Sequence, residues 1–347
     1  MGVNLTPIII KTVLSLDDLR GRSFAVDANN YLYQFLSLIR MPDGTSLQDS
    51  RGNITSHLAG LMFRSTRLMH DYDMQLAFVF DGKPPQLKQH EIMKRRELRD
   101  KATQEWQDAL REGDYATAFS KAVMTSRLTQ PLIDDAKTLL SLLGIPWVQA
   151  PSEAEAQSAY MAMKGDVWAA SSKDYDSLLF GAPKLLRYLT ISGREFLPSK
   201  GISRPLEPEL IELNKFLASY GISREQLVDA ALLIGTDFNE GVKGIGPKTA
   251  LNLIRKHGSV ESLPFDVRSK LEDQNVEAVR RIYLQPEVTS DYVVKFSEMN
   301  EDGLFRFLCE ERDFSRSRVE TVVQRMRVFH RRKRQAELKE WLGADHG

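Results

Sequence analysis

Seven acidic residues between Asp27 and Asp237 have the types and positions needed to hold divalent cations. Asp27, Asp81 and Asp174 each follow an apolar, strand-like stretch: SFAV, LAFVF and VWAASSK. Open α/β sheets bind ligands at the carboxyl ends of their strands, so these carboxylates are expected to meet there. Glu153 and Glu155 form one close pair, and Asp174 and Asp176 form another. Asp237 stands alone.

Converging carboxylates point to metal-assisted chemistry. They repel one another at neutral pH and need a cation between them. A ligand set made only of oxygen suits Mg²⁺ or Mn²⁺. Sites of this kind most often act on phosphate esters, so the sequence predicts metal-assisted hydrolysis of a phosphate ester.

Each acidic motif also has a structural explanation. Ser152 and Glu155 have the spacing of a capping box, and acidic residues are favoured in the first turn of a helix. Asp174 and Asp176 would point to one side of an extended chain, but they also fit an acidic turn. Asp81 precedes a glycine, as in an Asp-Gly turn. The sequence leaves both explanations open for each motif.

Charge is unevenly distributed along the chain. There are 347 residues, with 47 basic and 47 acidic, so the net charge is zero, which alone argues against a nucleic-acid partner. Residues 83–101, however, contain seven basic and three acidic residues, and residues 312–334 contain nine basic and two acidic. Phosphate binding depends on local charge, so these stretches could bind nucleic acid. Each also fits a solvated helix face.

Two features of the sequence indicate the cellular compartment of the protein. Cys309 is the only cysteine, which excludes an intramolecular disulfide and fits a reducing interior. We find no signal peptide and no apolar run near the roughly 20 residues that a membrane span needs. The expectation is an intracellular protein, neither secreted nor attached to a membrane.

The order of expected elements predicts an α/β fold: a mostly parallel, twisted central sheet with helices on both faces. Pro84 and Pro85 end the second strand, and a polar helical insertion is expected over 86–128. A loosely ordered tail is expected over 331–347. Strands are expected at 23–27, 76–82, 145–149, 167–171 and 184–190. Helices are expected at 29–39, 55–72 and 131–144, and another begins at Ser152. The stretch 208–334 is expected to be mainly helical.

Gly244-Ile245-Gly246 forms a short glycine hairpin, followed by Pro247 at a helix start, with Lys243 and Lys248 on either side. Free N–H groups at such a helix start can grip a phosphate, as in helix-hairpin-helix elements that bind DNA of any sequence. A glycine-ended helix followed by a proline-started one is the alternative. Tyr33 could stack on a base or belong to the core.

Six motifs, in this order, closely resemble the flap endonucleases: DANNYLYQFL, TSHLAGLMFR, FDGKPPQLK, GIPWVQAPSEAEAQ, DYDSLLFGAP and GTDFNEGVKGIGPK. The resemblance runs from Met1 to about Leu342, and the compact length favours the archaeal type within this superfamily of structure-specific 5′ nucleases. It implies a 5′ flap endonuclease with 5′–3′ exonuclease activity at single-strand/double-strand DNA junctions. Two-metal hydrolysis, Okazaki fragment maturation and long-patch base excision repair are implied as well.

The resemblance also implies roles for individual residues. All seven acidic residues would surround two Mg²⁺ ions, with Mn²⁺ able to substitute; Glu153, Glu155 and Asp174 would lie nearer one ion, Asp176 nearer the other, and Asp27, Asp81 and Asp237 would act largely through water. Lys88 and Arg95 would be catalytic groups facing the scissile phosphate. The implied DNA contacts are Tyr33 stacking on a base, Arg40 and Arg64 near the junction, and Gly244, Gly246 and Lys248 in a helix-two-turn-helix element with a K⁺ ion.

The resemblance further implies one nuclease domain, 1–330, and a tail, 331–347. Within the domain, 83–130 would form a helical arch between nuclease parts 1–82 and 131–235, and 236–330 would carry the duplex-binding helices. The tail resembles a box that binds the sliding clamp (PCNA), through Gln335, Leu338, Trp341 and Leu342, although Leu342 replaces an aromatic residue. A monomer acting on 5′-flap and nicked or gapped duplex DNA in the cytoplasm, associated with the nucleoid, is expected.

Three other functions are weighed against this one. An exonuclease or bubble-cutting member of the same superfamily would share most motifs. A non-catalytic DNA-binding subunit that recruits a clamp would have no need for all seven carboxylates. A magnesium phosphatase acting on small esters would leave the glycine hairpin and the clamp-like tail unexplained.

Overall fold

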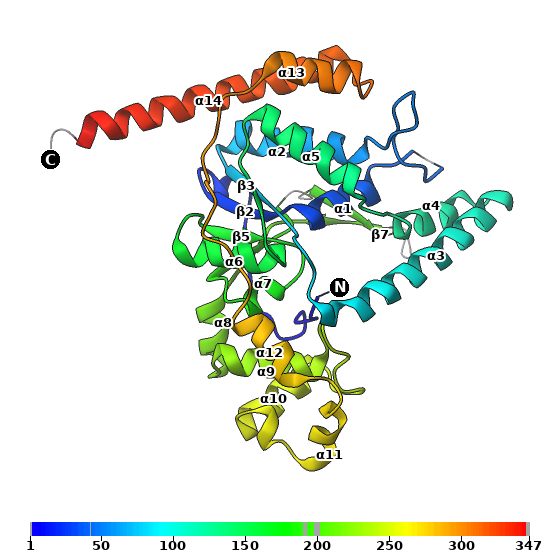
Figure 1. Ribbon diagram of the computed structural model, residues 1–347, viewed down its shortest axis with the longest axis vertical. Coiled ribbons are helices and arrows are strands. Elements are labelled where there is room, and N and C mark those ends of the chain that lie inside the picture. Colours follow the sequence, from blue (N-terminus) through cyan, green and yellow to red (C-terminus); the bar gives the residue numbers. More distant parts are fainter. Residues whose placement is uncertain (1, 42, 190–192, 198–201, 345–347) are drawn as a thin grey trace.

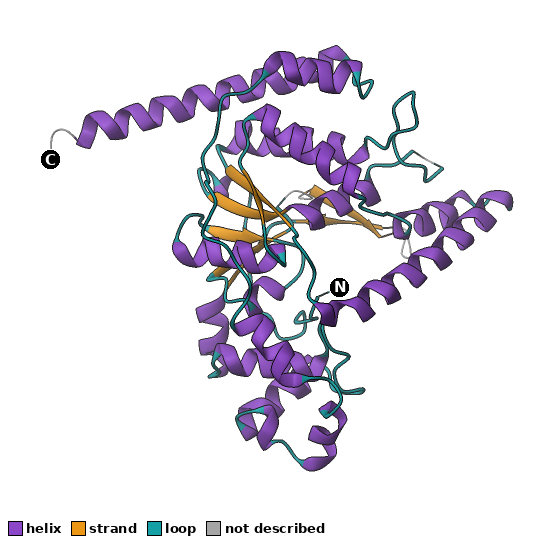
Figure 2. Ribbon diagram, in the orientation of Figure 1, coloured by secondary structure: helices purple, strands orange, loops and turns teal. Residues whose placement is uncertain are grey.

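A twisted sheet of seven strands lies at the centre of the computed structural model, with helices on both faces (Figures 1 and 2). The structure describes residues 2–41, 43–189, 193–197 and 202–344, with backbone alone for 193–197, 202–205 and 337–344. The strands follow in the order β1–β9–β6–β5–β2–β3–β4. Their bounds are β1 Thr12–Val13, β2 Ser23–Asp27, β3 Gln75–Phe80, β4 Trp147–Gln149, β5 Ala169–Ser171, β6 Lys184–Arg187 and β9 Glu209–Glu212.

The sheet is mostly parallel, which confirms the predicted α/β fold. β6, β5, β2, β3 and β4 pair in parallel, and only the two pairings made by β9 are antiparallel among the described strands of this sheet. Parallel strands place their carboxyl ends at one edge. β2 lies between β5 and β3, so the ends of β5, β2, β3 and β4 are neighbours at that edge.

Side chains of the central strands alternate between two apolar layers. Phe24 and Val26 of β2 pack toward α1 (Ala28–Leu38), α2 (Ser56–Tyr72) and α5 (Gln130–Leu143). Ala25 faces the opposite layer together with Ala77 of β3. These small residues let α6 (Ala154–Lys164) approach the sheet closely, below it in Figure 1.

The helical insertion predicted over 86–128 contains α3 (Gln89–Arg111) and α4 (Tyr115–Met124). The two helices lie side by side and project from the sheet (Figure 1). In α3 the buried residues are Ala102 and Ala109, and in α4 they are Ala118 and Ala122. The polar, helix-favouring sequence of this stretch therefore buries only small side chains between two exposed helices.

Below the sheet in Figure 1, a helical layer follows α7 (Asp176–Leu179) and shares its own apolar core. Ser223 and Gln226 form a capping box at the start of α9. The helices of the layer are α8 Leu213–Tyr220, α9 Arg224–Ile234, α10 Pro247–His257, α11 Phe265–Arg268 and α12 Val276–Leu284.

Residues 285–300, here called the strap, run without helix or strand from α12 to the helices above the sheet. The Gln157 side chain of α6 donates to the Thr289 carbonyl at 2.9 Å and accepts from its N–H at 2.8 Å. Further along, the Asn300 N–H donates to the Leu142 carbonyl at 2.8 Å. The strap leads into α13 (Glu301–Phe305), a helical turn at 306–310, and α14 (Arg316–Ala344).

Some sequence-based expectations about elements were wrong, and some strands were not expected. The backbone of 331–344 continues α14 as helix instead of forming a loose tail, in keeping with its helix-favouring residues. The stretch from 208 to 334 is mainly helical, as predicted, but it begins with the strand β9, which was not expected. A hairpin, β7 (Gly193–Leu197) with β8 (Ile202–Leu206), was not expected. The strand expected over 184–190 ends at Arg187, because Tyr188 has a positive φ of 62°; Thr190 lies outside the described residues.

No helix within the described ranges is both long and apolar enough to span a membrane.

Candidate metal and nucleic-acid site

Acidic side chains gather where the parallel strands end. Asp27 is the last residue of β2, Asp81 follows β3, and Glu153 and Glu155 lie at the start of α6, after β4. Oxygen atoms of Asp81, Glu153 and Glu155 lie within 4.8 Å of one another. Hard carboxylate oxygens at this spacing fit a cation such as Mg²⁺ or Mn²⁺. The acidic cluster is therefore able to bind a metal ion.

Asp81 also fixes the start of α6. Its Oδ1 accepts from the Ala154 N–H at 2.7 Å. The predicted capping box of Ser152 and Glu155 is wrong, because the N-cap residue is Glu153 and its side chain makes no capping hydrogen bond. The Asp81 carboxylate, which follows another strand, thus accepts a backbone N–H at the start of α6. Glu155 remains available to the acidic cluster. No residue larger than glycine fits at Gly82, where a Cβ would lie 2.2 Å from the Ala150 carbonyl oxygen.

Asp27 is held by groups that the sequence analysis did not single out. It is 2% exposed and caps α1 by accepting from the Asn30 N–H at 3.0 Å. The Ser172 hydroxyl donates to its other oxygen at 3.1 Å. Asn30 Nδ2 donates in turn to Asp174 at 3.0 Å. Asn30 thus joins two carboxylates from neighbouring strand ends, and the asparagine pair of the DANNYLY motif was the signal available for it.

Asp176 opens the short helix α7, so of the two explanations left open for Asp174 and Asp176, the extended chain does not hold. Its Oδ1 accepts from the Val3 N–H and from the Tyr283 hydroxyl, each at 3.3 Å. Gly2 lies against Oδ2, where a Cβ would come within 1.4 Å. Two segments remote in sequence therefore meet at this carboxylate.

Two cations from the helical insertion face the acidic cluster. The Lys88 ammonium pairs with Glu153 and lies 3.6 Å from Asp237. Arg95, on α3, donates to both oxygens of Asp237 at 2.7 Å. The predicted catalytic residues thus lie beside the predicted metal-site residues, at the base of the projecting helices.

Burial and mutual repulsion shape the titration of the cluster. Burial, together with the charge of Asp81, raises the pKa of Asp27 to about 7. Burial and the charge of Asp237 raise the pKa of Asp176 to about 7 as well. Burial would also raise the pKa of Asp237, but the charges of Arg95 and Lys88 and the hydrogen bond from Arg95 are among the interactions that together outweigh burial and hold that pKa below its ordinary value. The cluster thus needs positive charge to ionise fully at neutral pH.

The remaining predicted DNA contacts lie apart from the carboxylates. Tyr33 is 37% exposed on α1, so it is not a core tyrosine. Arg40 donates to the Gly44 carbonyl at 2.6 Å and to the Ser126 hydroxyl at 2.8 Å. Arg64 lies exposed on α2.

The glycine hairpin has the expected local form. Gly244 has a φ of +89°, which favours glycine, and Gly246 is the N-cap of α10 with Pro247 as its first residue. Lys243 and Lys248 are exposed beside it. Basic side chains thus flank a helix start that glycine caps.

Of the predicted clamp box, Gln335 is an exposed residue of α14. The side chains of Leu338, Trp341 and Leu342 lie outside the described residues.

Known protein families and individual proteins match this chain over most of its length. Residues 1–102 match the XPG N-terminal domain, and residues 144–237 match the XPG I-region. Flap endonuclease 1 of Thermococcus onnurineus is 46% identical over 99% of both chains. The chain belongs to the flap endonuclease family. Another member, flap endonuclease 1 of Caldivirga maquilingensis, is 49% identical over 94% of this chain and 95% of its own.

Solved structures have the same fold. The flap endonuclease-1 of Methanococcus jannaschii is 38% identical, with a TM-score of 0.74 over 95% of this chain and 100% of its own. The catalytic core of Rad2 in complex with a DNA substrate shares the fold, with 24% identity and a TM-score of 0.67 over 93% of this chain and 97% of its own.

Proposed function

We propose that this flap endonuclease family member cuts 5′-flap DNA at single-strand/double-strand junctions and removes nucleotides as a 5′–3′ exonuclease. The support is geometric: acidic side chains gather at the carboxyl edge of the sheet, with Lys88 and Arg95 facing them from the insertion. Carboxylates able to hold a metal ion and cations able to bind a phosphate are therefore neighbours. Glu153, Glu155 and Asp174 would lie nearer one Mg²⁺ or Mn²⁺ ion, and Asp176 would lie nearer a second. Asp81, whose oxygen lies within 4.8 Å of oxygens of both glutamates, would act largely through water bound to the first ion.

When bound, such ions activate water and stabilise the leaving oxygen of a phosphodiester. Side chains of the protein would supply the remaining contributions to catalysis. Lys88 and Arg95 would exchange their carboxylate partners for the non-bridging oxygens of the scissile phosphate and stabilise the charge that builds up there. Asp27, held by Asn30 and Ser172, and Asp237 would keep the surroundings negative and orient bound water.

The DNA would be held at several places. Lys248 and the N–H groups of the Gly244–Gly246 hairpin would grip the duplex backbone, with a K⁺ ion at the same element. Tyr33 would stack on the base next to the scissile phosphate, and Arg40 and Arg64 would lie near the junction. The helices α3 and α4 would form an arch that admits only single-stranded DNA with a free 5′ end.

The cellular setting is proposed on the same basis. Residues 1–330 would form the nuclease domain, with the arch at 83–130, and a monomer would act in Okazaki fragment maturation and long-patch base excision repair at the nucleoid. Gln335, Leu338, Trp341 and Leu342 would bind the sliding clamp. A pull-down with the clamp, comparing the protein with a Trp341→Ala variant, tests that contact.

Cleavage of a 5′-labelled double-flap DNA tests the main proposal. A single cut beside the junction is expected with Mg²⁺, none with chelator, and none with Asp81→Ala. The matched control is Asp166→Ala, which removes a carboxylate at the other end of α6 and should cut normally. Binding of the flap without any cut in Mg²⁺ or Mn²⁺ would contradict the proposal and favour a non-catalytic role.

A further inference from the structure

Tyr283 brings the C-terminal helical layer into contact with the acidic cluster. It belongs to α12, and its hydroxyl donates to Asp176 Oδ1 at 3.3 Å. α12 packs against α9, which leads into the loop that carries Asp237 and the glycine hairpin. One phenol therefore joins the proposed duplex-binding layer to a carboxylate of the proposed metal site.

The direction of this phenol is fixed by packing. Tyr283 is fully buried, and its ring lies 4.9 Å from that of Phe180 and 5.4 Å from that of Phe238, centroid to centroid. A buried tyrosine hydroxyl requires a hydrogen-bond partner. Held between two aromatic rings, the hydroxyl reaches Asp176 without further adjustment of the side chain.

Asp176 receives a second donor on the same oxygen from the Val3 N–H. With Gly2 against its other oxygen, the carboxylate is surrounded by groups from the start of the chain and from α12. Partners of this kind orient a metal ligand and strengthen its binding of the ion. Removing the phenol would leave Asp176 with one of these two donors.

We infer that Tyr283 is a positioning residue, which orients the Asp176 carboxylate for a divalent cation and thereby links α12 to the metal site. The inference rests on the proposed function, because Asp176 must take part in metal binding. Tyr283 touches neither substrate nor metal in this role. Its hydroxyl also has a hydrogen bond with the Thr236 side chain, and its effect on the metal site would pass through Asp176.

Metal binding by the full chain without DNA tests this role directly. Mn²⁺ is titrated at neutral pH, and the free ion is measured by electron paramagnetic resonance. Tyr283→Phe keeps the ring and its packing but removes the hydroxyl. We expect the weaker class of Mn²⁺ sites to lose about tenfold in affinity, the lower end for loss of such a partner. The melting temperature in chelator should change by no more than a few degrees.

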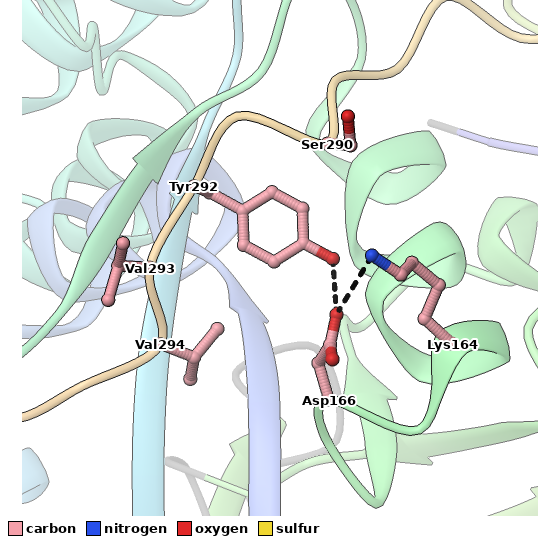
Figure 3. A pocket seen from close by; sticks show the side chains of 6 residues that line it. All are labelled: Lys164, Asp166, Ser290, Tyr292, Val293 and Val294. Atoms are coloured by element: carbon pink, nitrogen blue, oxygen red, sulfur yellow. Dashed lines mark hydrogen bonds and ion pairs between the residues drawn. The ribbon is translucent and has the colours of Figure 1, made fainter.

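Tyr292→Phe is the matched control. Tyr292 also donates its phenol to an aspartate, Asp166, at 2.5 Å, but at the far end of α6 beside Lys164 (Figure 3). Its Mn²⁺ isotherm should equal that of the unaltered protein. Excess Mg²⁺ should restore single-turnover cleavage by Tyr283→Phe, since only the affinity for the ion is reduced.

An unchanged Mn²⁺ isotherm for Tyr283→Phe, or an equal loss in both variants, would overturn the inference. Failure of the proposed function would give a different result, in the cleavage of flap DNA. In that case the unaltered protein would not cut flap DNA at any metal concentration, whatever the two isotherms show.

Discussion

Lys88 offers the sharpest test of how the insertion contributes to chemistry. Its side chain is 16% exposed, and its ammonium lies beside both Glu153 and Asp237. In Lys88→Ala, a single donor to the developing phosphoryl charge is lost, which typically lowers the rate of the chemical step by about 10²–10³-fold. Binding of flap DNA should fall far less, because it is shared among many phosphate contacts.

Single-turnover cleavage of a double-flap DNA, with protein in excess, measures the first quantity. Fluorescence anisotropy with Ca²⁺ in place of Mg²⁺ measures the second. Lys83→Ala, which removes a nearby exposed lysine, is the control and should leave the single-turnover rate near that of the unaltered protein. Equal losses of rate and of binding in Lys88→Ala would refute the argument.

Lys88→Ala should also lower the stability of the folded protein in chelator. Because Lys88 offsets the charge of Glu153 and Asp237, its removal leaves carboxylates facing one another in chelator. Thermal melting followed by circular dichroism should show a lower midpoint in chelator, and Mg²⁺ should narrow the difference. A loss that Mg²⁺ does not reduce would indicate a general folding defect.

Three further predictions address binding, threading and pH. Lys248→Ala should weaken binding of any duplex sequence, and the slope of log affinity against log salt concentration should become smaller by about one. The single-turnover rate at saturating protein should not change. A loss of binding limited to some sequences would contradict this. A flap whose 5′ end is blocked by a bulky duplex should be cut poorly, and normal cutting would exclude threading through α3 and α4. In chelator, the raised pKa values of Asp27 and Asp176, about 7 against 3.8, mean that the folded protein holds protons that the unfolded chain has released. Stability should therefore be greatest below about pH 4 for these groups and fall as pH rises through 7, with Mg²⁺ reversing the loss; melting midpoints that rise from pH 5 to 8 in chelator would show the sign to be wrong.

The sequence predicted the sheet well where its strands carry a strong local signal. SFAVD and QLAFVF are apolar runs ended by an acidic residue, and both are strands of the central sheet. β9 and the β7–β8 hairpin were not predicted, because their stretches lack such runs and depend on pairing partners. The tail was misjudged since polar helix-favouring residues fit a loose segment as well as a helix.

The candidate site was predicted in its residue types but not in its contacts. The position of Asp81 at the start of α6 could not be foreseen, because its partner Ala154 lies in another element. Ser152 and Glu155 satisfied a local capping rule that a distant carboxylate overrides. Tyr283 was not singled out from the sequence, and only the fold brings it to Asp176. Contacts between remote segments carry no signal in a single sequence.

The packing of α14 sets the order in which the protein can mature. Val322, Met326 and Phe329 of this helix are fully buried in the same core as α2, which is synthesised much earlier. A chain emerging from the ribosome therefore carries the part of α2 that faces α14 uncovered until α14 has been made, although α1 and α5 can already cover other parts of α2. Exposed apolar surfaces of this kind are prone to aggregate. We expect a chain that ends before α14 to aggregate instead of forming a smaller nuclease.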